Sequence, residues 1–331
     1  MPTDCHAKIT AIIGLSKNAG KTTYLNHLLA QHEGKVCGVF STGRDGEEKD
    51  LVFANPKPPL KIGIGTYFCC DTKHASRFGS SATIITRLSQ HSASGQLWLL
   101  KAESPLETEI TGPANCRGQA ELAQEMLALG IEQVFIDGSL DRKSIVINSA
   151  IDDIHLVVGA GFGSLDKIRE EVKRLYLLTQ VPLCHRIVNS LADADSSIHV
   201  FTQHGWQDIG ISSLIGHFEV LQQSIPSGAT TLYVPGAVTE SMVKKLCSLL
   251  KAQGLSLLVR HPLNLHLGWA TLSSLLGGFT IETVLGFHIK RIALNAQGIG
   301  SVSIPAHELR NKLRQDFVDI DVMDVMEIYE Q

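Results

Sequence analysis

The stretch of residues 9–23 constrains the fold of this chain more than any other part of the sequence. Residues 9–13 are mostly apolar and β-branched, as in a buried strand. Gly14 and Gly20 bound the loop that follows, and Lys-Thr-Thr comes directly after it. A strand that breaks into a glycine-bounded loop and resumes as a helix favours a fold of alternating strands and helices.

The same stretch is typical of a phosphate-binding loop (P-loop). Glycines let successive backbone N–H groups face phosphate oxygens, and the following helix adds the positive end of its dipole. Lys21 would neutralise the β- and γ-phosphates, and the Thr22 hydroxyl would ligate Mg²⁺. The alternative is an ordinary turn between a strand and a helix. We predict a site for ATP and Mg²⁺ whose nucleotide contacts come from Gly14, Lys17, Asn18, Ala19, Gly20, Lys21, Thr22 and Thr23.

The loop departs from the pattern G-x-x-x-x-G-K-[ST] by one residue, because five residues separate Gly14 from Gly20. Leu15 therefore stands where the first glycine is usual. Lys17 is a second lysine, and it lies inside the loop. Because of this lysine, the loop resembles the deviant P-loops of ParA-like and dethiobiotin-synthetase-like ATPases. Their signature lysine lies one place earlier, where this chain has Ser16, so a contact between Lys17 and phosphate stays open.

Two acids are candidates for chemistry beside the loop. Asp137 follows the apolar residues 134–136, and a P-loop protein holds Mg²⁺ through an acid at the end of such a strand. The alternative for Asp137 is a cap on the next turn. Asp45 follows a predicted strand at residues 36–40 and would ligate Mg²⁺ through water, orient the attacking water or brace its loop. We predict Lys21, Asp45 and Asp137 as catalytic residues, and Thr22 and Asp137 as metal ligands.

Strand and helix patterns alternate along the first half of the chain, which predicts an α/β fold with a mostly parallel sheet flanked by helices. Strands are expected at 97–102, 133–137 and 154–158, and helices at 22–31, 118–130 and 165–178. The later pattern predicts strands at 231–234, 256–259, 289–294 and 317–320, and helices at 240–251 and 306–314. We expect a P-loop nucleotide-binding domain over residues 1–182 and a C-terminal α/β domain over residues 183–331.

Composition narrows the class of protein. With 44% hydrophobic residues, 19% charged residues and a net charge of −4, the chain is expected to be globular, without a basic surface for nucleic acid. Its 7 cysteines show no C-x-x-C spacing, which favours reduced thiols in the cytoplasm over a zinc site or disulfides. The most apolar long stretch, residues 267–281, is too short to span a bilayer, and we expect it to form buried core.

Four segments together resemble one family of P-loop ATPases. They are the loop 17–23, residues 43–47, the connector 56–58, and residues 137–144 with Gly159 and Ala160. The chain is similar in these segments to the ATPase subunit of the reactivating factors for B12-dependent lysine 5,6-aminomutase and ornithine aminomutase. That resemblance implies ATP hydrolysis, a cobalamin-dependent aminomutase as partner and a second reactivase subunit. It assigns Gly20, Lys21 and Thr22 to nucleotide and Mg²⁺, and Asp137 to the metal.

Three functional hypotheses follow. The first is a chaperone-like ATPase in which hydrolysis changes loops 41–48 and 138–144, and thereby the grip on a protein partner. The second is a metabolic enzyme of the dethiobiotin-synthetase type that phosphorylates a small carboxylate or amide. The third is a module that binds nucleotide without hydrolysing it.

Overall fold

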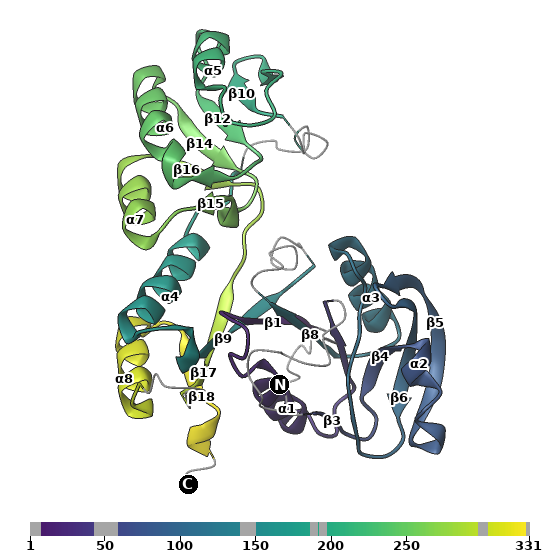
Figure 1. Cartoon of the computed structure of the whole chain (residues 1–331). Coiled ribbons are helices and arrows are strands. Elements are labelled where there is room, and N and C mark those ends of the chain that lie inside the picture. The colour runs from purple at the N-terminus through teal and green to yellow at the C-terminus, as the bar shows by residue number, and fades with distance from the viewer. Residues whose placement is uncertain are drawn as a thin grey trace, which may run out of the picture. The chain divides into compact units, whose positions relative to one another are not determined.

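The computed structural model describes residues 8–42, 59–139, 150–185, 191, 197–296 and 304–328. The chain forms two compact units, one made of residues 1–168 with 287–331 and the other of residues 169–286. Figure 1 shows both units along the chain. The boundary between the units falls inside α4 (Leu165–Thr179).

The first unit is built on a nine-stranded sheet with the order β18-β17-β9-β1-β8-β2-β4-β6-β5. All neighbouring strands from β18 to β4 are parallel, and only β6 runs against the others. The predicted α/β class with a mostly parallel sheet flanked by helices is therefore confirmed. The strands are β1 (Lys8–Gly14), β2 (Cys37–Ser41), β4 (Tyr67–Asp71), β5 (Ala82–Ser92), β6 (Gly95–Ala102), β8 (Gln133–Ser139), β9 (Asp153–Gly159), β17 (Ile289–Asn295) and β18 (Asp321–Asp324).

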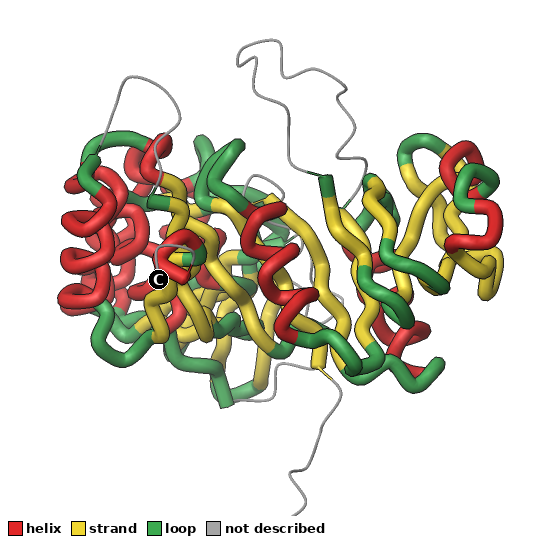
Figure 2. Tube along the Cα trace, turned by 90° about the horizontal axis from the view of Figure 1, so that it is seen from below, coloured by secondary structure: helices red, strands yellow, loops and turns green. Residues whose placement is uncertain are grey.

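Helices and a short ribbon complete this unit. Its helices are α1 (Lys21–Gln31), α2 (Thr72–Ala75), α3 (Cys116–Ala128) and α8 (Ala306–Asp316), and the ribbon pairs β3 (Leu60–Ile62) with β7 (Leu106–Thr108). Figure 2 shows the strands side by side with helices packed along them. The central strands β1 and β9 are buried along almost their whole length, as expected where a parallel sheet is covered on both faces.

The second unit contains a smaller sheet of five strands in the order β11-β10-β12-β14-β16. These strands are β10 (His199–Thr202), β11 (Gly205–Asp208), β12 (Thr231–Val234), β14 (Ser256–Val259) and β16 (Ile281–Thr283). Its helices are α5 (Phe218–Ser224), α6 (Glu240–Gln253) and α7 (Trp269–Gly278), and β13 (Val238–Thr239) pairs with β15 (Leu265–His266).

The units differ from the predicted boundary between residues 182 and 183. The last part of the chain returns to the first unit because β17 pairs with β9 in parallel, from Ile289 beside Ile154 to Asn295 beside Gly159. Two local predictions were wrong. Residues 317–320 form a turn and the strand follows them as β18, while residues 267–281 contain α7, which buries only some of its side chains.

Candidate phosphate-binding site

The loop between β1 and α1 lies where the connections of the sheet diverge. β1 is paired in parallel with β8 on one side and β9 on the other. The chain runs from β1 through α1 to β2, which lies on the far side of β8 in the sheet. It later crosses from β8 to β9, which lies on the other side of β1. In open parallel sheets, ligands bind beyond the carboxyl ends of the strands at such a switch point. Residues 15–20 therefore lie where this fold class places a ligand.

Backbone conformation ends the loop and starts the helix. Gly20 has φ of 97° and caps α1 without a side-chain hydrogen bond, while Asn18 has φ of 57°. No acidic residue lies in the first turn of α1. The first N–H groups of a helix need partners from outside the helix, and here no side chain caps them from the Gly20 position. This helix start is therefore suited to an anionic ligand.

Lys21 bends back over the end of β1. A Cβ placed on Gly14 would lie 3.1 Å from both Cγ and Cδ of Lys21, so the glycine leaves room for the aliphatic stem of the lysine. Within the described residues, Lys21 and Lys17 form no ion pair, and Lys17 is exposed. Thr22, the next residue of α1, is buried. The fold thus places the stem of Lys21 against Gly14, with the buried Thr22 next to it at the start of α1.

The ends of two other strands of the sheet, β9 and β17, lie close to the loop. A Cβ on Gly159, at the end of β9, would lie 2.9 Å from Cα of Ala19, and a Cβ on Gly20 would lie 2.6 Å from Nδ2 of Asn295, at the end of β17. The backbone N–H of Leu15 also donates to the carbonyl of Val157 at 2.8 Å. Gly159 and Asn295 were not predicted as site residues. A local sequence pattern does not show that the ends of β9 and β17 lie close to the loop.

Asp137 lies on β8, the strand next to β1. It stands beside Ile12 on one side and beside Ser41 on the other, and its side chain is buried at 5% exposure. The strand continues two residues beyond Asp137, to Ser139, which is in register with Gly14, so the expectation that an acid ends this strand was wrong. The structure brings Asp137 to a strand adjacent to the one that leads into the loop.

Several predicted residues lie outside the described part of the chain. These are Asp45 with the rest of the segment 43–47, the connector 56–58, and residues 140–144. Their sequence-based roles stay predictions.

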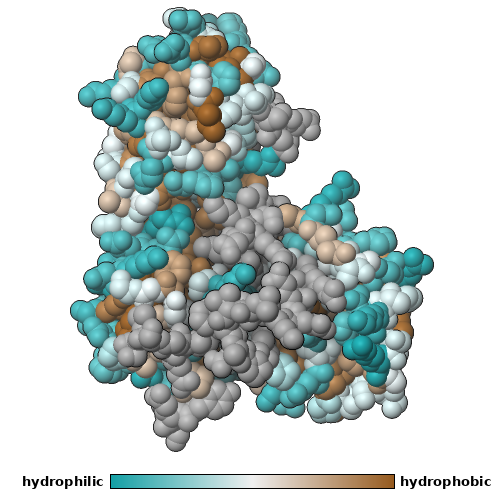
Figure 3. All heavy atoms as spheres, in the orientation of Figure 1, coloured by the Kyte–Doolittle hydropathy of each residue, from teal (hydrophilic) through white to brown (hydrophobic). Residues whose placement is uncertain are grey.

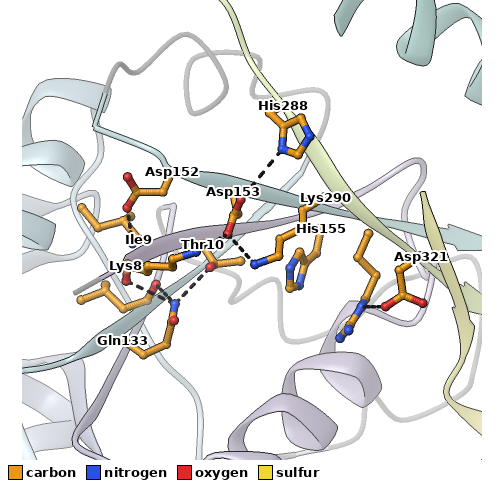
Figure 4. Close-up of polar contacts among 12 residues, drawn as sticks. Lys8, Ile9, Thr10, Gln133, Asp152, Asp153, His155, His288, Lys290 and Asp321 are labelled. Atoms are coloured by element: carbon orange, nitrogen blue, oxygen red, sulfur yellow. Dashed lines mark hydrogen bonds and ion pairs between the residues drawn. The ribbon is translucent and has the colours of Figure 1, made fainter. Parts of the chain in front are cut away.

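Charged side chains of a different kind gather at the opposite, amino end of these strands (Figure 4). Asp153 accepts a hydrogen bond from Lys290 at 3.0 Å and pairs with Lys8 at 3.6 Å. Burial by itself raises the pKa of Asp153, but the hydrogen bond and charge of Lys290, with the charge of Lys8, hold that pKa below its ordinary value. These contacts tie the starts of β1, β9 and β17 together.

A buried pair joins α1 to β9, where His155 lies beside Ile12 of β1. The Tyr24 hydroxyl and His155 Nδ1 lie 2.9 Å apart, and both residues are buried. Burial raises the pKa of Tyr24 to about 12 and, with the charge of Arg291, lowers the pKa of His155 to about 4. Arg291 in turn pairs with Asp321 at 2.6 Å. The neutral tyrosine and histidine anchor α1 and with it the start of the helix that follows the loop.

The part of the chain that the structure describes lacks two other features. It contains no group of three or more His, Cys, Asp and Glu side chains that could hold a metal, and no helix with the length and apolar character needed to cross a membrane. On the face shown in Figure 3, polar residues cover much of the described surface and apolar residues lie in separate patches.

Comparisons of the chain with protein-family models, with curated proteins and with solved structures found no match. The class of protein that fold and site define is therefore an α/β protein with a glycine-bounded loop at the switch point of a mostly parallel sheet.

Proposed function

We propose that this chain binds ATP with Mg²⁺ at residues 14–23 and hydrolyses it. The observation that carries the proposal is the position of Lys21, whose stem folds over Gly14 at the carboxyl end of β1, between the parallel strands β8 and β9. A lysine there stands beside a helix start that lacks a side-chain cap, and both features attract phosphate.

Each residue of the site has a role in this proposal. Lys21 offsets the negative charge of the phosphates, and the Thr22 hydroxyl and the Asp137 carboxylate hold the metal. Gly14 and Gly20 keep Cβ atoms out of the positions that Lys21 and Asn295 occupy. Asp45 orients water, and Lys17 is a second phosphate contact. When bound, ATP supplies the phosphoanhydride bond and Mg²⁺ neutralises its developing charge.

The resemblance to the aminomutase reactivating factors extends the proposal to a partner. Hydrolysis would release loops near the nucleotide and so change the affinity for a cobalamin-dependent aminomutase and for a second reactivase subunit, in the cytoplasm. The support for this step is the set of sequence segments given above, and the fold is compatible with it because an α/β sheet places its loops at one edge.

Binding and hydrolysis of ATP by the full chain test the site. We expect Lys21→Ala to lower hydrolysis by about 100-fold or more, since it removes a charge aimed at the reacting phosphate. Asp137→Asn should lower hydrolysis and weaken the dependence on Mg²⁺. Lys35→Ala, at an exposed position just after α1, is the matched control and should behave as wild type. Unchanged ATP affinity and hydrolysis in Lys21→Ala would contradict the site.

The partner is tested separately. Slow basal hydrolysis that rises when the aminomutase is added supports the reactivating role. Hydrolysis that needs a small carboxylate or amide instead supports a metabolic kinase, and ATP binding without any hydrolysis supports a binding module. Either of the last two results overturns the reactivating role while leaving the nucleotide site intact.

A further inference from the structure

The outer edge of β5 is an interaction surface that the proposed ATP site does not use. β5 is the last strand at one end of the nine-stranded sheet, with β8, β2, β4 and β6 between it and β1 (Figure 1). It pairs with β6 on one side, and no described strand pairs with it on the other. Such an edge presents a row of backbone N–H and C=O groups that another strand can join.

The two halves of β5 differ in how this edge is protected. In the second half, residues 88–90 stand together against Leu97, and the carbonyl of His91 accepts a hydrogen bond from the N–H of Ala114 at 3.1 Å. Breaks in pairing and covering segments of this kind close the edges of sheets. Apart from β6, no described segment hydrogen-bonds to the backbone of residues 82–86. The first half is therefore the open part of the edge.

The side chains of the open half are uncharged. Residues 83–86 read Thr-Ile-Ile-Thr, and all four are exposed. Ile84 is 49% exposed and Ile85 is 39% exposed. Strand edges that avoid pairing carry lysine, other charges or proline, and the first charge here is Arg87. Two exposed isoleucines beside an open backbone edge therefore favour a partner strand over water.

The sequence of this edge is complementary to itself. Thr-Ile-Ile-Thr reads the same in both directions, so two antiparallel copies centred on the isoleucines set threonine against threonine and isoleucine against isoleucine. Pairs of β-branched residues across neighbouring strands stabilise a sheet. The segment thus matches a second copy of this chain.

The bulge in β5 makes this match compatible with strand geometry. Residues three apart in a regular strand turn their backbone groups to opposite sides, so Thr83 and Thr86 could not both face one partner. Here Thr83 lies opposite Lys101 and Thr86 lies opposite Leu99, which are two residues apart on β6 and face the same way. The extra residue, Ile85, therefore brings both threonines to the same side of β5.

We propose that residues 82–87 pair with the same residues of a second copy of this chain, as antiparallel strands about a two-fold axis at the isoleucines. Thr83 then lies opposite the partner's Thr86, and Ile84 and Ile85 of the two copies pack on one another. Arg87 lies opposite the partner's Ala82, so the charge of this segment does not meet a like charge. One surface serves both copies, as in other two-fold dimers.

Sedimentation equilibrium of the full chain tests the proposal. Six residues from each copy form a contact at the small end of specific interfaces, so we expect a weak dimer with a dissociation constant of about 10–100 μM. Backbone amides of residues 83–86 should exchange hydrogen more slowly as the dimer fills. A chain that stays monomeric up to about 300 μM would overturn the proposal.

Variants with opposite charges locate the axis. Ile84→Lys and Ile84→Glu should each weaken the dimer by about 10-fold or more, because two like charges meet at the axis. An equal mixture of the two variants should pair at least about 10-fold more tightly than either alone. Ile215→Lys, at an isoleucine of the second unit that is 68% exposed, is the matched control and should dimerise as wild type. Urea denaturation checks that each variant is folded.

Three further results would overturn the proposal. The first is a dimer that Ile84→Lys leaves unchanged, since its interface then lies on another face. The second is a mixture of the two charged variants that pairs no better than each alone. The third is slower amide exchange at residues 83–86 in a chain that remains monomeric, because this edge is then covered from within the chain.

Discussion

The two ends of β1 carry opposite arrangements of charge. At the amino end, Lys8 is paired with Asp153 and the N–H of Ile9 donates to Asp152 at 2.8 Å. At the carboxyl end, Lys17 and Lys21 form no ion pair within the described residues. A paired charge contributes to stability, whereas an unpaired one at a loop remains available to a ligand. Within the described residues, the charges at the amino edge are paired with one another, whereas the carboxyl edge carries the lysines of the proposed ATP site.

Gly20→Ala should have the largest effect, and it acts at the carboxyl end. An alanine at φ of 97° is strained, and its Cβ would lie 2.6 Å from Nδ2 of Asn295. We expect a loss of about 3–5 kcal/mol in the free energy of unfolding, from backbone strain and steric overlap together. Urea denaturation measures this loss, and ATP titration of the folded fraction should show weaker binding.

Gly34→Ala is the matched control, because Gly34 has φ of 85° but nothing within 4 Å of its Cβ position. It carries the backbone strain alone and should lose about 1–2 kcal/mol. The double variant Gly20→Ala/Asn295→Ala should recover part of the difference. If Gly20→Ala and Gly34→Ala lose the same stability, Asn295 does not press on the loop.

Local patterns were sufficient to predict most elements around the loop. The helix expected at 22–31 is α1, and the strand expected at 154–158 is β9, because apolar periodicity and glycine are local signals. The return of β17 to β9 was missed, since pairing between strands more than a hundred residues apart leaves no mark in a short window.

Close approaches of the backbone were equally invisible in the sequence. A Cβ on Gly112 would lie 1.7 Å from the carbonyl oxygen of Ser41, so only glycine fits where this segment crosses the end of β2. Nothing around Gly112 in the chain distinguishes it from a glycine in a turn. The contact between Gly20 and Asn295 is of the same kind, and it connects a predicted site residue to one that the pattern could not supply.

Acid should destabilise the sheet around His155, which lies beside Ile12 of β1. Burial lowers the pKa of His155 to about 4, while an unfolded histidine takes up its proton near 6.5. Between these values the unfolded state binds more protons, so stability falls as the pH falls. We expect a loss of about 2 kcal/mol between pH 7 and pH 5, measured by urea denaturation.

His155→Asn is the control for this pH dependence. Its side chain reaches the position of Nδ1 and keeps a partner for the Tyr24 hydroxyl, but it does not titrate. The decline between pH 7 and pH 5 should be smaller by about 2 kcal/mol in this variant. An equal decline in both proteins would show that another group causes it.

Asp153→Ala tests whether the amino end serves stability alone. The variant leaves Lys290 and Lys8 without their shared carboxylate, yet both lysines are about half exposed and water can solvate them. We therefore expect a loss of about 1–2 kcal/mol in the free energy of unfolding. ATP hydrolysis per folded molecule should stay unchanged, and a loss of hydrolysis beyond the loss of folded protein would contradict the division between the two edges.

Lys8→Ala should have the smallest effect, although it removes a charge from the same strand that leads to the loop. Its ammonium lies 3.6 Å from Asp153, which keeps the closer hydrogen bond from Lys290 at 3.0 Å. The Lys8 side chain is about half exposed, so salt screens its charge. The expected loss in the free energy of unfolding is about 0.2–1 kcal/mol, and it should be smaller in 1 M NaCl. Lys290→Ala is the comparison, and it should lose more because it removes the hydrogen bond that lowers the pKa of Asp153. If the two lysine variants lose equal stability at low and high salt, the amino end of β1 is held by packing and not by its charges.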